Sequence, residues 1–239
     1  MKQYDLIEIF EDLHISSDKW MPYFDIYENH IVHTMYNHPI EQPLVLVEVG
    51  VQKGGSLQMW HEYLTNNHDP SYTTAGIKII GIDIDPECAK LKYVTSNIEV
   101  IVGDQSDPVF WDEFLKKVPK IDIFIDDGGH YMQQQILTFE KVFPHIQNNG
   151  VYICEDCHTS YMSGNGGGLG RRGTFIEYAK SYVDVLHYNW KEEMTSDLEH
   201  KNKIGQGLSG LFFYDSVVVF EKHEKKEMKR VFPKLFTPT

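Results

Sequence analysis

Acidic side chains follow several apolar, strand-like segments of this sequence at the point where each segment ends. The acids in this position are Glu48, Asp83, Asp104, Asp126, Asp127, Glu155 and Asp156. In a parallel sheet the carboxyl ends of the strands share one edge, and ligands bind at that edge. These acids are therefore expected to be neighbours in space and to form a binding or catalytic site.

Three of the carboxylates, Asp127, Glu155 and Asp156, are predicted to bind a divalent cation, most simply Mg²⁺. Carboxylate oxygens are the hard ligands that this ion prefers, and no lysine or arginine stands beside them in the sequence. His130 lies three residues after Asp127 and is the candidate general base, because an imidazole titrates near neutral pH. His158, three residues after Glu155, is the competing candidate.

The segment Leu44–Trp60 runs from an apolar strand through a glycine turn into a helix that begins near Ser56. This arrangement forms a cradle for a ligand at a strand end. The turn matches the G-x-G-x-x-G pattern of dinucleotide-binding proteins poorly. Glu48 beside the turn would repel a pyrophosphate but not a cationic ligand, which favours S-adenosylmethionine (SAM).

Two further strand ends have the polar groups that such a ligand needs. Asp83 closes the second predicted strand, where a carboxylate accepts hydrogen bonds from a ribose diol. Asp104 and Gln105 follow the third strand, where a polar side chain would hold an adenine edge.

Strand and helix patterns alternate from residue 44 onward. Strands are predicted at 44–49, 77–82, 98–102, 121–125 and 151–154, the last preceded by a turn at 148–150. Helices are predicted to begin near 56 and to span 86–91, 108–117, 132–143 and 174–185. A hairpin is predicted over 210–214 and 216–220, and a short basic helix in the tail. The fold class is α/β, with a doubly wound, mostly parallel seven-stranded sheet and a C-terminal antiparallel hairpin.

Two segments are predicted to border the site. Residues 1–40 are interpreted as an N-terminal helical entry or lid segment, and residues 41–239 as the main domain. The aromatic side chains Trp20, Tyr23, Phe24 and Tyr27 either pack against the sheet or form a wall of the substrate pocket. The glycine-rich stretch 163–173 is predicted to be a mobile loop over the site.

Composition excludes several classes of protein. The chain has 239 residues and a net charge of −13, which argues against nucleic acid as the main partner. The acidic N-terminus is unlike a signal peptide, and no apolar run approaches the roughly 20 residues of a membrane span. With only three cysteines, a reducing, cytoplasmic location is expected. The aromatic N-terminal segment makes a homo-oligomer plausible.

Residues 154–158 read C-x-x-C-H, a pattern found at covalent haem attachment sites. Haem is rejected because the motif begins at a predicted buried strand end, two acids occupy its x positions, and there is no export signal. A C-x-x-C redox pair is a slightly better alternative, although one such pair is a weak signal.

Five motifs in this order resemble the class I SAM-dependent methyltransferases. They are EVGVQKGGSLQMW, GIDIDP, GDQSD, DDGGH and ICEDCHTSY, preceded by the segment SDKW…YFDIYE. Within that class the chain resembles the metal-dependent sugar O-methyltransferases of macrolide biosynthesis, of the mycinamicin type, to which cephalosporin-hydroxylase-like proteins are related.

The resemblance implies a Mg²⁺-dependent O-methyltransferase acting on a hydroxyl of a small-molecule, glycosidic or other polyol acceptor. Asp127, Glu155 and Asp156 match the magnesium ligands, and His130 matches the base; Asp127 and His130 are the predicted catalytic residues. The predicted cofactor-binding set is Glu48, Gly50, Gly55, Ser56, Asp83, Asp104, Gln105 and Asp126. The alternatives are a cephalosporin-hydroxylase-like homologue and a SAM-binding protein without catalysis.

Overall fold

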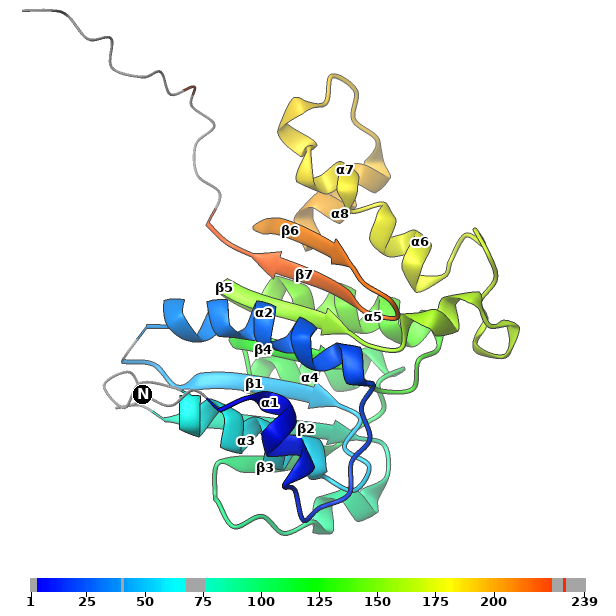
Figure 1. Cartoon of the computed structure of the whole chain (residues 1–239). Coiled ribbons are helices and arrows are strands. Elements are labelled where there is room, and N and C mark those ends of the chain that lie inside the picture. Colours follow the sequence, from blue (N-terminus) through cyan, green and yellow to red (C-terminus); the bar gives the residue numbers. More distant parts are fainter. Residues whose placement is uncertain (1–3, 40, 68–75, 225–229, 231–239) are drawn as a thin grey trace, which may run out of the picture.

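A computed structural model describes residues 4–39, 41–67, 76–224 and 230 (Figure 1). Its centre is a seven-stranded sheet in the order β3-β2-β1-β4-β5-β7-β6. The strands are β1 (Leu44–Val49), β2 (Ile77–Asp83), β3 (Ile98–Val102), β4 (Ile121–Asp126), β5 (Ile146–Cys154), β6 (Leu208–Phe213) and β7 (Val218–Lys222). Strands β1 to β5 pair in parallel, whereas β7 runs antiparallel between β5 and β6. The predicted sheet and its C-terminal antiparallel pair are confirmed.

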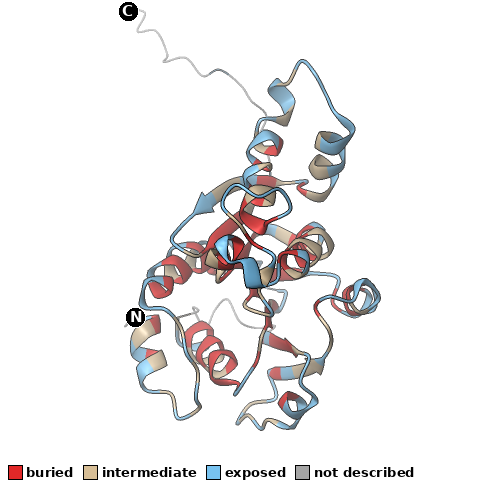
Figure 2. Cartoon of the chain, turned by 90° about the vertical axis from the view of Figure 1, so that its right-hand side faces the viewer, coloured by how far each residue is buried: buried red, intermediate tan, exposed pale blue. Residues whose placement is uncertain are grey.

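Helices cover both faces of this sheet (Figure 1). One face packs against α1 (Leu6–Glu11), α2 (Met21–Asn37) and α3 (Gly55–Asn67). The other packs against α4 (Pro108–Lys117), α5 (Met132–Val142), α6 (Phe175–Lys180) and α7 (Val183–Leu186). Helix α8 (Ser196–Ile204) has no fully buried residue, but its Leu198 and Ile204 pack partly buried against the second core. Figure 2 shows that the top of the molecule is largely exposed.

Strand β1 illustrates why the sheet needs two layers. Successive side chains of a strand point to opposite faces. Leu44 and Leu46 accordingly join the core beneath α2 and α3, while Val47 and Val49 join the core beneath α4 and α5. The same alternation points Glu48 toward the α2 and α3 face.

The prediction for the fifth strand was wrong at its start. Strand β5 begins at Ile146, so the predicted turn at residues 148–150 lies inside it. Ile121 and Ile123 of β4 pair with Ile146 and Val151, so the intervening residues of β5 form a bulge, with Asn149 at φ 67°. Turn-forming residues mark bulges as well as turns, and the sequence pattern did not distinguish the two.

The remaining differences are local. The predicted helix 174–185 is two short helices, α6 and α7, and the unassigned stretch 189–207 contains α8. A short 3-10 helix, Phe143–His145, follows α5 at Pro144, where the helix was expected to end. The predicted basic helix of the tail lies outside the described residues.

The N-terminal segment belongs to the core of the molecule. Tyr23, Phe24 and Tyr27 are buried against the sheet, whereas Trp20 is 63% exposed. Packing against the sheet is therefore confirmed for Tyr23, Phe24 and Tyr27, whereas a wall of the substrate pocket stays a prediction. Nowhere in the described ranges is there a helix both long and apolar enough to cross a membrane.

Candidate active site

The predicted acids meet at the carboxyl edge of the parallel strands. Figure 2 looks onto this edge, toward which the arrowheads of β1, β4 and β5 point in Figure 1. Asp127 follows β4, and Glu155 and Asp156 follow β5, whose ends pair at Asp126 and Cys154. A pocket of about 400 Å³ opens among these residues. The carboxylates that the sequence separates are therefore neighbours, as predicted.

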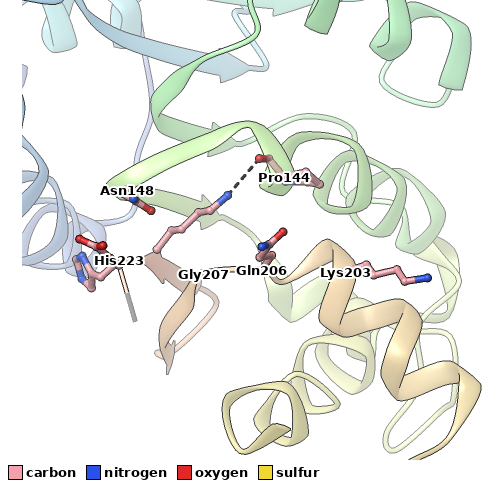
Figure 3. Close-up of a pocket in the computed structure, with 8 residues that line it drawn as sticks. Pro144, Asn148, Lys203, Gln206, Gly207 and His223 are labelled. Carbon is pink, nitrogen blue, oxygen red and sulfur yellow. Dashed lines mark hydrogen bonds between the residues drawn. The ribbon is translucent and has the colours of Figure 1, made fainter. Parts of the chain in front are cut away.

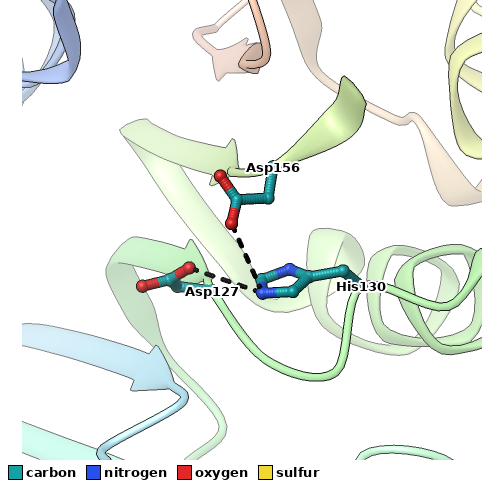
Figure 4. A group of neighbouring side chains, drawn as sticks. All are labelled: Asp127, His130 and Asp156. Carbon is teal, nitrogen blue, oxygen red and sulfur yellow. Dashed lines mark ion pairs between the residues drawn. The ribbon is translucent and has the colours of Figure 1, made fainter. Parts of the chain in front are cut away.

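Asp127, His130 and Asp156 form a compact group (Figure 4). The Nε2 of His130 lies 3.9 Å from Oδ1 of Asp127 and 3.5 Å from Oδ2 of Asp156. His130 and Asp156 have positive φ angles of 56° and 51°, a region that few non-glycine residues adopt. The backbone is thus held in an unusual conformation that brings the imidazole and the carboxylates together.

A lysine that the sequence analysis did not consider lies in the middle of the acids. The Nζ of Lys19 contacts Glu48 at 3.3 Å, Asp127 at 2.6 Å and Glu155 at 3.0 Å, and its side chain is 2% exposed. Burial lowers the pKa of Lys19, but the surrounding carboxylates raise it well above its ordinary value, so the ammonium stays charged. The premise that no basic residue neighbours these acids was wrong in space, although it is true along the chain.

A hydroxyl network holds Asp156 and His158. The Tyr23 hydroxyl donates to Oδ1 of Asp156 at 2.7 Å and lies 2.8 Å from Oγ of Ser216. Nδ1 of His158 hydrogen bonds to the same serine, which sits at φ 67° in the turn between β6 and β7. His158 is thus tied to the hairpin, whereas Nε2 of His130 faces the pocket carboxylates.

A more apolar pocket of about 400 Å³ adjoins the acidic one. Its lining includes Trp20, Pro22 and Met162, and it shares Trp20, Tyr23 and His158 with the acidic pocket. The two pockets together offer an acidic, polar end and an apolar wall.

Asp126 and Gln105, two predicted cofactor-binding residues, are buried and bonded within the protein. Gln105 donates to Oδ1 of Asp126 and accepts from the backbone N–H of Gly129, and the Tyr152 hydroxyl donates to Oδ2 of Asp126 at 2.8 Å. Burial raises the pKa of Asp126 to about 7, against the lowering effect of these hydrogen bonds. Their visible role is to fix the loop that carries Asp127 and His130.

Glu48, Gly55 and Ser56 are likewise buried. Oε2 of Glu48 accepts from Nε1 of Trp60 at 3.1 Å, and the Ser56 side chain also hydrogen bonds to this carboxylate. A Cβ on Gly55 would lie 2.7 Å from the carbonyl oxygens of Ile15 and Ser16. The start of α3 is therefore packed against the N-terminal segment, and direct contact of these three residues with a cofactor stays a prediction.

Gly50, Asp83 and Asp104 are the partly exposed members of the predicted cofactor set. Asp83 accepts backbone N–H bonds from Val51, Gln52 and Asp85. Burial raises the pKa of Asp83, but the backbone hydrogen bonds lower it by more, so the pKa lies below its ordinary value. Gly50 has φ 93°, and a Cβ there would lie 2.0 Å from the carbonyl oxygen of Asp127, so only glycine permits this approach.

Asp104 accepts from the backbone N–H and hydroxyl of Ser106, which orders the loop after β3. Its contact with an adenine edge stays a prediction.

The cysteine motif has no geometry for redox chemistry. Cys154 and Cys157 are free, with exposures of 0% and 1%. The Cys157 thiol donates to the Cys154 carbonyl, and burial raises the pKa of the Cys154 thiol. A buried thiol of raised pKa is a poor nucleophile, which argues against the redox alternative.

A separate hollow lies at the opposite edge of the sheet (Figure 3). Lys222, at the end of β7, donates there to the carbonyl of Pro144 at 3.1 Å. None of the predicted site residues lines this hollow.

The donors at the carboxyl edge fit a divalent cation. One ligand atom each from Asp127, His130 and Asp156 lie within 4.8 Å of one another, and the Nδ1 of His130 is buried without a hydrogen-bond partner among the described residues. Glu155 lies behind them, and its oxygens accept from Lys19 at 3.0 Å and from the Tyr27 hydroxyl at 2.6 Å. Each carboxylate oxygen has a second lone pair, so Glu155 keeps the capacity to bind an ion.

Known proteins share both the sequence pattern and the fold. Residues 47–157 match a family described as a methyltransferase domain. The MycE methyltransferase of the mycinamycin biosynthetic pathway, solved in complex with Mg and SAH, superposes with a TM-score of 0.74 at 26% identity. That match covers 98% of this chain and 58% of the MycE chain.

Residues 47–157 of this chain are a methyltransferase domain.

Two curated relatives of this chain are named for sugar O-methylation. One is the 8-demethyl-8-(2-methoxy-alpha-L-rhamnosyl)-tetracenomycin-C 3'-O-methyltransferase of Streptomyces olivaceus, 30% identical over 89% of this chain and 53% of its own length. The other is the mycinamicin VI 2''-O-methyltransferase of Micromonospora griseorubida, 30% identical over 73% of this chain and 41% of its own length. The chain thus spans about half the length of these relatives.

Sequence reasoning missed Lys19 and Ser216 as residues of the site, and it did not foresee the hydrogen bond of Tyr27 to Glu155. Lys19 stands in the segment SDKW, which the sequence analysis noted without giving its lysine a role. Ser216 lies in the predicted hairpin turn, and nothing in its local sequence marks it.

Proposed function

We propose that this methyltransferase is a SAM- and Mg²⁺-dependent O-methyltransferase that acts on a hydroxyl of a sugar or other polyol-bearing natural product. The observation that carries the proposal is the group of Asp127, His130 and Asp156 at the carboxyl edge of a methyltransferase sheet. The named activities of the relatives support the same reaction class.

The chemistry of the two pockets favours a neutral acceptor that has both polar and apolar parts. Their linings contain one basic side chain that carries a permanent charge, Lys19, and its ammonium already contacts three carboxylates. A phosphorylated acceptor or nucleic acid would meet Asp127, Glu155 and Asp156 without a free counterion. A glycoside places hydroxyls near these acids and an apolar aglycone near Trp20.

Asp127, Glu155 and Asp156 would hold Mg²⁺, which supplies Lewis-acid activation and alignment of neighbouring hydroxyls. His130 would accept the hydroxyl proton at Nε2, and the adjacent carboxylates would stabilise the resulting imidazolium. SAM would lie over the glycine turn at Gly50, near Asp83 and Asp104. Alignment of the oxygen with the methyl group would supply most of the rate.

Three further proposals concern the chain as a whole. Residues 1–40 would border the acceptor pocket, since Trp20 and Tyr23 line both pockets. The exposed side chains of Trp20 and Met21 would favour self-association. A cytoplasmic location would suit three free cysteines.

The test is a methyl-transfer assay with labelled SAM and a panel of glycosides that bear neighbouring hydroxyls. Transfer should require Mg²⁺ and stop when EDTA is added. A deoxy analogue lacking the second hydroxyl should react much more slowly. If SAM binds but no panel member is methylated with or without Mg²⁺, a non-catalytic SAM-binding role is favoured instead.

A further inference from the structure

Lys19 is a buried cation that contacts carboxylates at the ends of three strands. Its ammonium contacts carboxylates that follow or belong to β1, β4 and β5: Glu48, Asp127 and Glu155. The proposed mechanism uses no lysine, so the position of this residue calls for another explanation.

In each of the three carboxylates one oxygen accepts a hydrogen bond from Lys19 and the other faces a different side chain. Oε1 of Glu48 accepts a hydrogen bond from Lys19, and its Oε2 accepts one from Trp60. In the same way, Oε2 of Glu155 accepts from Lys19, and its Oε1 accepts from Tyr27.

Oδ2 of Asp127 accepts a hydrogen bond from Lys19 at 2.6 Å, while its Oδ1 lies 3.9 Å from Nε2 of His130. Among these three acids, Asp127 is therefore the one that turns an oxygen toward the group of His130 and Asp156.

We propose that Lys19 is a positioning residue that orients Asp127, and with it Glu155, for a divalent cation. Its ammonium holds Oδ2 of Asp127 and so presents Oδ1 to the space shared with His130 and Asp156. The inference rests on the proposed function, because the cation is the one that function requires.

Charge explains why a fixed cation is needed at this point. Three neighbouring carboxylates repel one another, and the two buried ones, Glu48 and Glu155, have lost solvation and need a counterion. One ammonium that touches all three sets their relative positions. Mg²⁺ demands near-ideal octahedral geometry, so small rotations of a ligand carboxylate weaken its binding.

The N-terminal segment places this ammonium accurately. Ile15 and Ser16 pack against the start of α3, where a side chain on Gly55 would not fit. After Lys19 the chain enters α2, whose Tyr27 is buried against Trp60 at a ring distance of 5.0 Å. Lys19 is thus held between two packed points of the chain.

The test compares Mn²⁺ binding, measured by isothermal titration calorimetry without acceptor, in the wild type, E48Q and the charge-matched double variant K19M/E48Q. The double variant removes one positive and one negative charge, so the net charge of the site is kept. We expect K19M/E48Q to bind about 10–100-fold more weakly than E48Q, the range for loss of an outer-shell partner.

Binding by K19M/E48Q equal to or tighter than that of E48Q would overturn the inference, because Lys19 would then act only as a charge or as a competitor of the metal. A wild type that binds no Mn²⁺ would instead contradict the metal requirement of the proposed function. The two failures are therefore distinguishable.

A crystal structure of the wild type with Mn²⁺ keeps the inference testable if the double variant does not fold. We expect the ion on Oδ1 of Asp127 while Nζ of Lys19 remains hydrogen bonded to Oδ2. An ion that displaces Lys19 from Asp127 would overturn the inference.

Discussion

Asp127 takes part both in the proposed metal site and in the packing of the loop after β4. It contacts Lys19 through one oxygen and faces His130 with the other. Its backbone carbonyl fills the space that a side chain on Gly50 would need. A substitution that keeps its shape but removes its charge therefore tests the chemistry with little disturbance of packing.

The D127N variant should lose Mg²⁺-stimulated methyl transfer and bind Mn²⁺ more weakly than the wild type by at least the roughly 10–100-fold expected of an outer-shell change. SAM binding should change little, because the cofactor contacts proposed above, Gly50, Asp83 and Asp104, lie at the ends of β1, β2 and β3. D215N is the matched control, since Asp215 lines the neighbouring pocket outside the metal group. Unchanged turnover in D127N would refute the metal assignment.

Asp126 should make the stability of the protein depend on pH. Burial raises its pKa from 3.8 to about 7, so the folded state holds this proton more tightly than the unfolded state. Its contribution is fully present below pH 3.8 and is lost as the pH rises through about 7. At about 1.4 kcal/mol per pH unit, the loss is at most about 4 kcal/mol.

The comparison is between the wild type and D126N, which mimics the neutral side chain, by urea unfolding from pH 4 to pH 8. The wild type should lose stability relative to D126N as the pH rises across this range. Parallel curves for the two proteins would show that Asp126 does not titrate in this window.

At the scale of elements, residues 15–16 of the N-terminal segment closely approach the start of α3 at Gly55. The two atoms nearest to a Cβ on Gly55 are the backbone carbonyl oxygens of Ile15 and Ser16, which cannot turn aside as a flexible side chain would.

The G55A variant should lose about 1–3 kcal/mol of unfolding free energy, the usual cost of overpacking. Guanidinium unfolding monitored by tryptophan fluorescence measures this loss. The matched control is G164A, where an added Cβ meets nothing within 4 Å and the change should stay within about 0.5 kcal/mol. Equal stability of the two variants would mean that the segment moves away without cost.

At the scale of the whole molecule, the site is assembled from both ends of the chain. Tyr23 of α2 bonds to Asp156 after β5 and to Ser216 in the last hairpin turn. Helices α1 and α2 also supply Leu6, Tyr27 and Ile31 to the core, each with 0% exposure. The described part of the N-terminal segment, residues 4–39, is therefore structural as well as close to the pocket.

A chain that begins at residue 41 should fail to unfold cooperatively and should bind no Mn²⁺, because it lacks this core layer and Lys19. Thermal unfolding followed by circular dichroism, with the full chain alongside, measures the first effect. Cooperative unfolding near the full-length temperature would mean that residues 1–40 are a detachable lid.

The local pattern of the sequence determined the fold class and the edge that carries the site. Period-two and helical spacings alternate along the chain, and parallel strands bring their carboxyl ends to one edge whatever their spacing in sequence. Asp127, Glu155 and Asp156, with His130 three residues after Asp127, could therefore be placed at one edge from sequence alone. The bulge in β5 could not be predicted, because it depends on pairing with β4 and β7.

Only the tertiary structure decided how the acids are used. Lys19 lies 29, 108 and 136 residues from its three carboxylate partners, and no local pattern encodes such contacts. Burial likewise separates Glu48, Gln105 and Asp126, which bond within the protein, from Asp83 and Asp104, which stay partly exposed. The type and order of residues set where charges gather, whereas packing sets which charges neutralise each other and which remain open to a ligand.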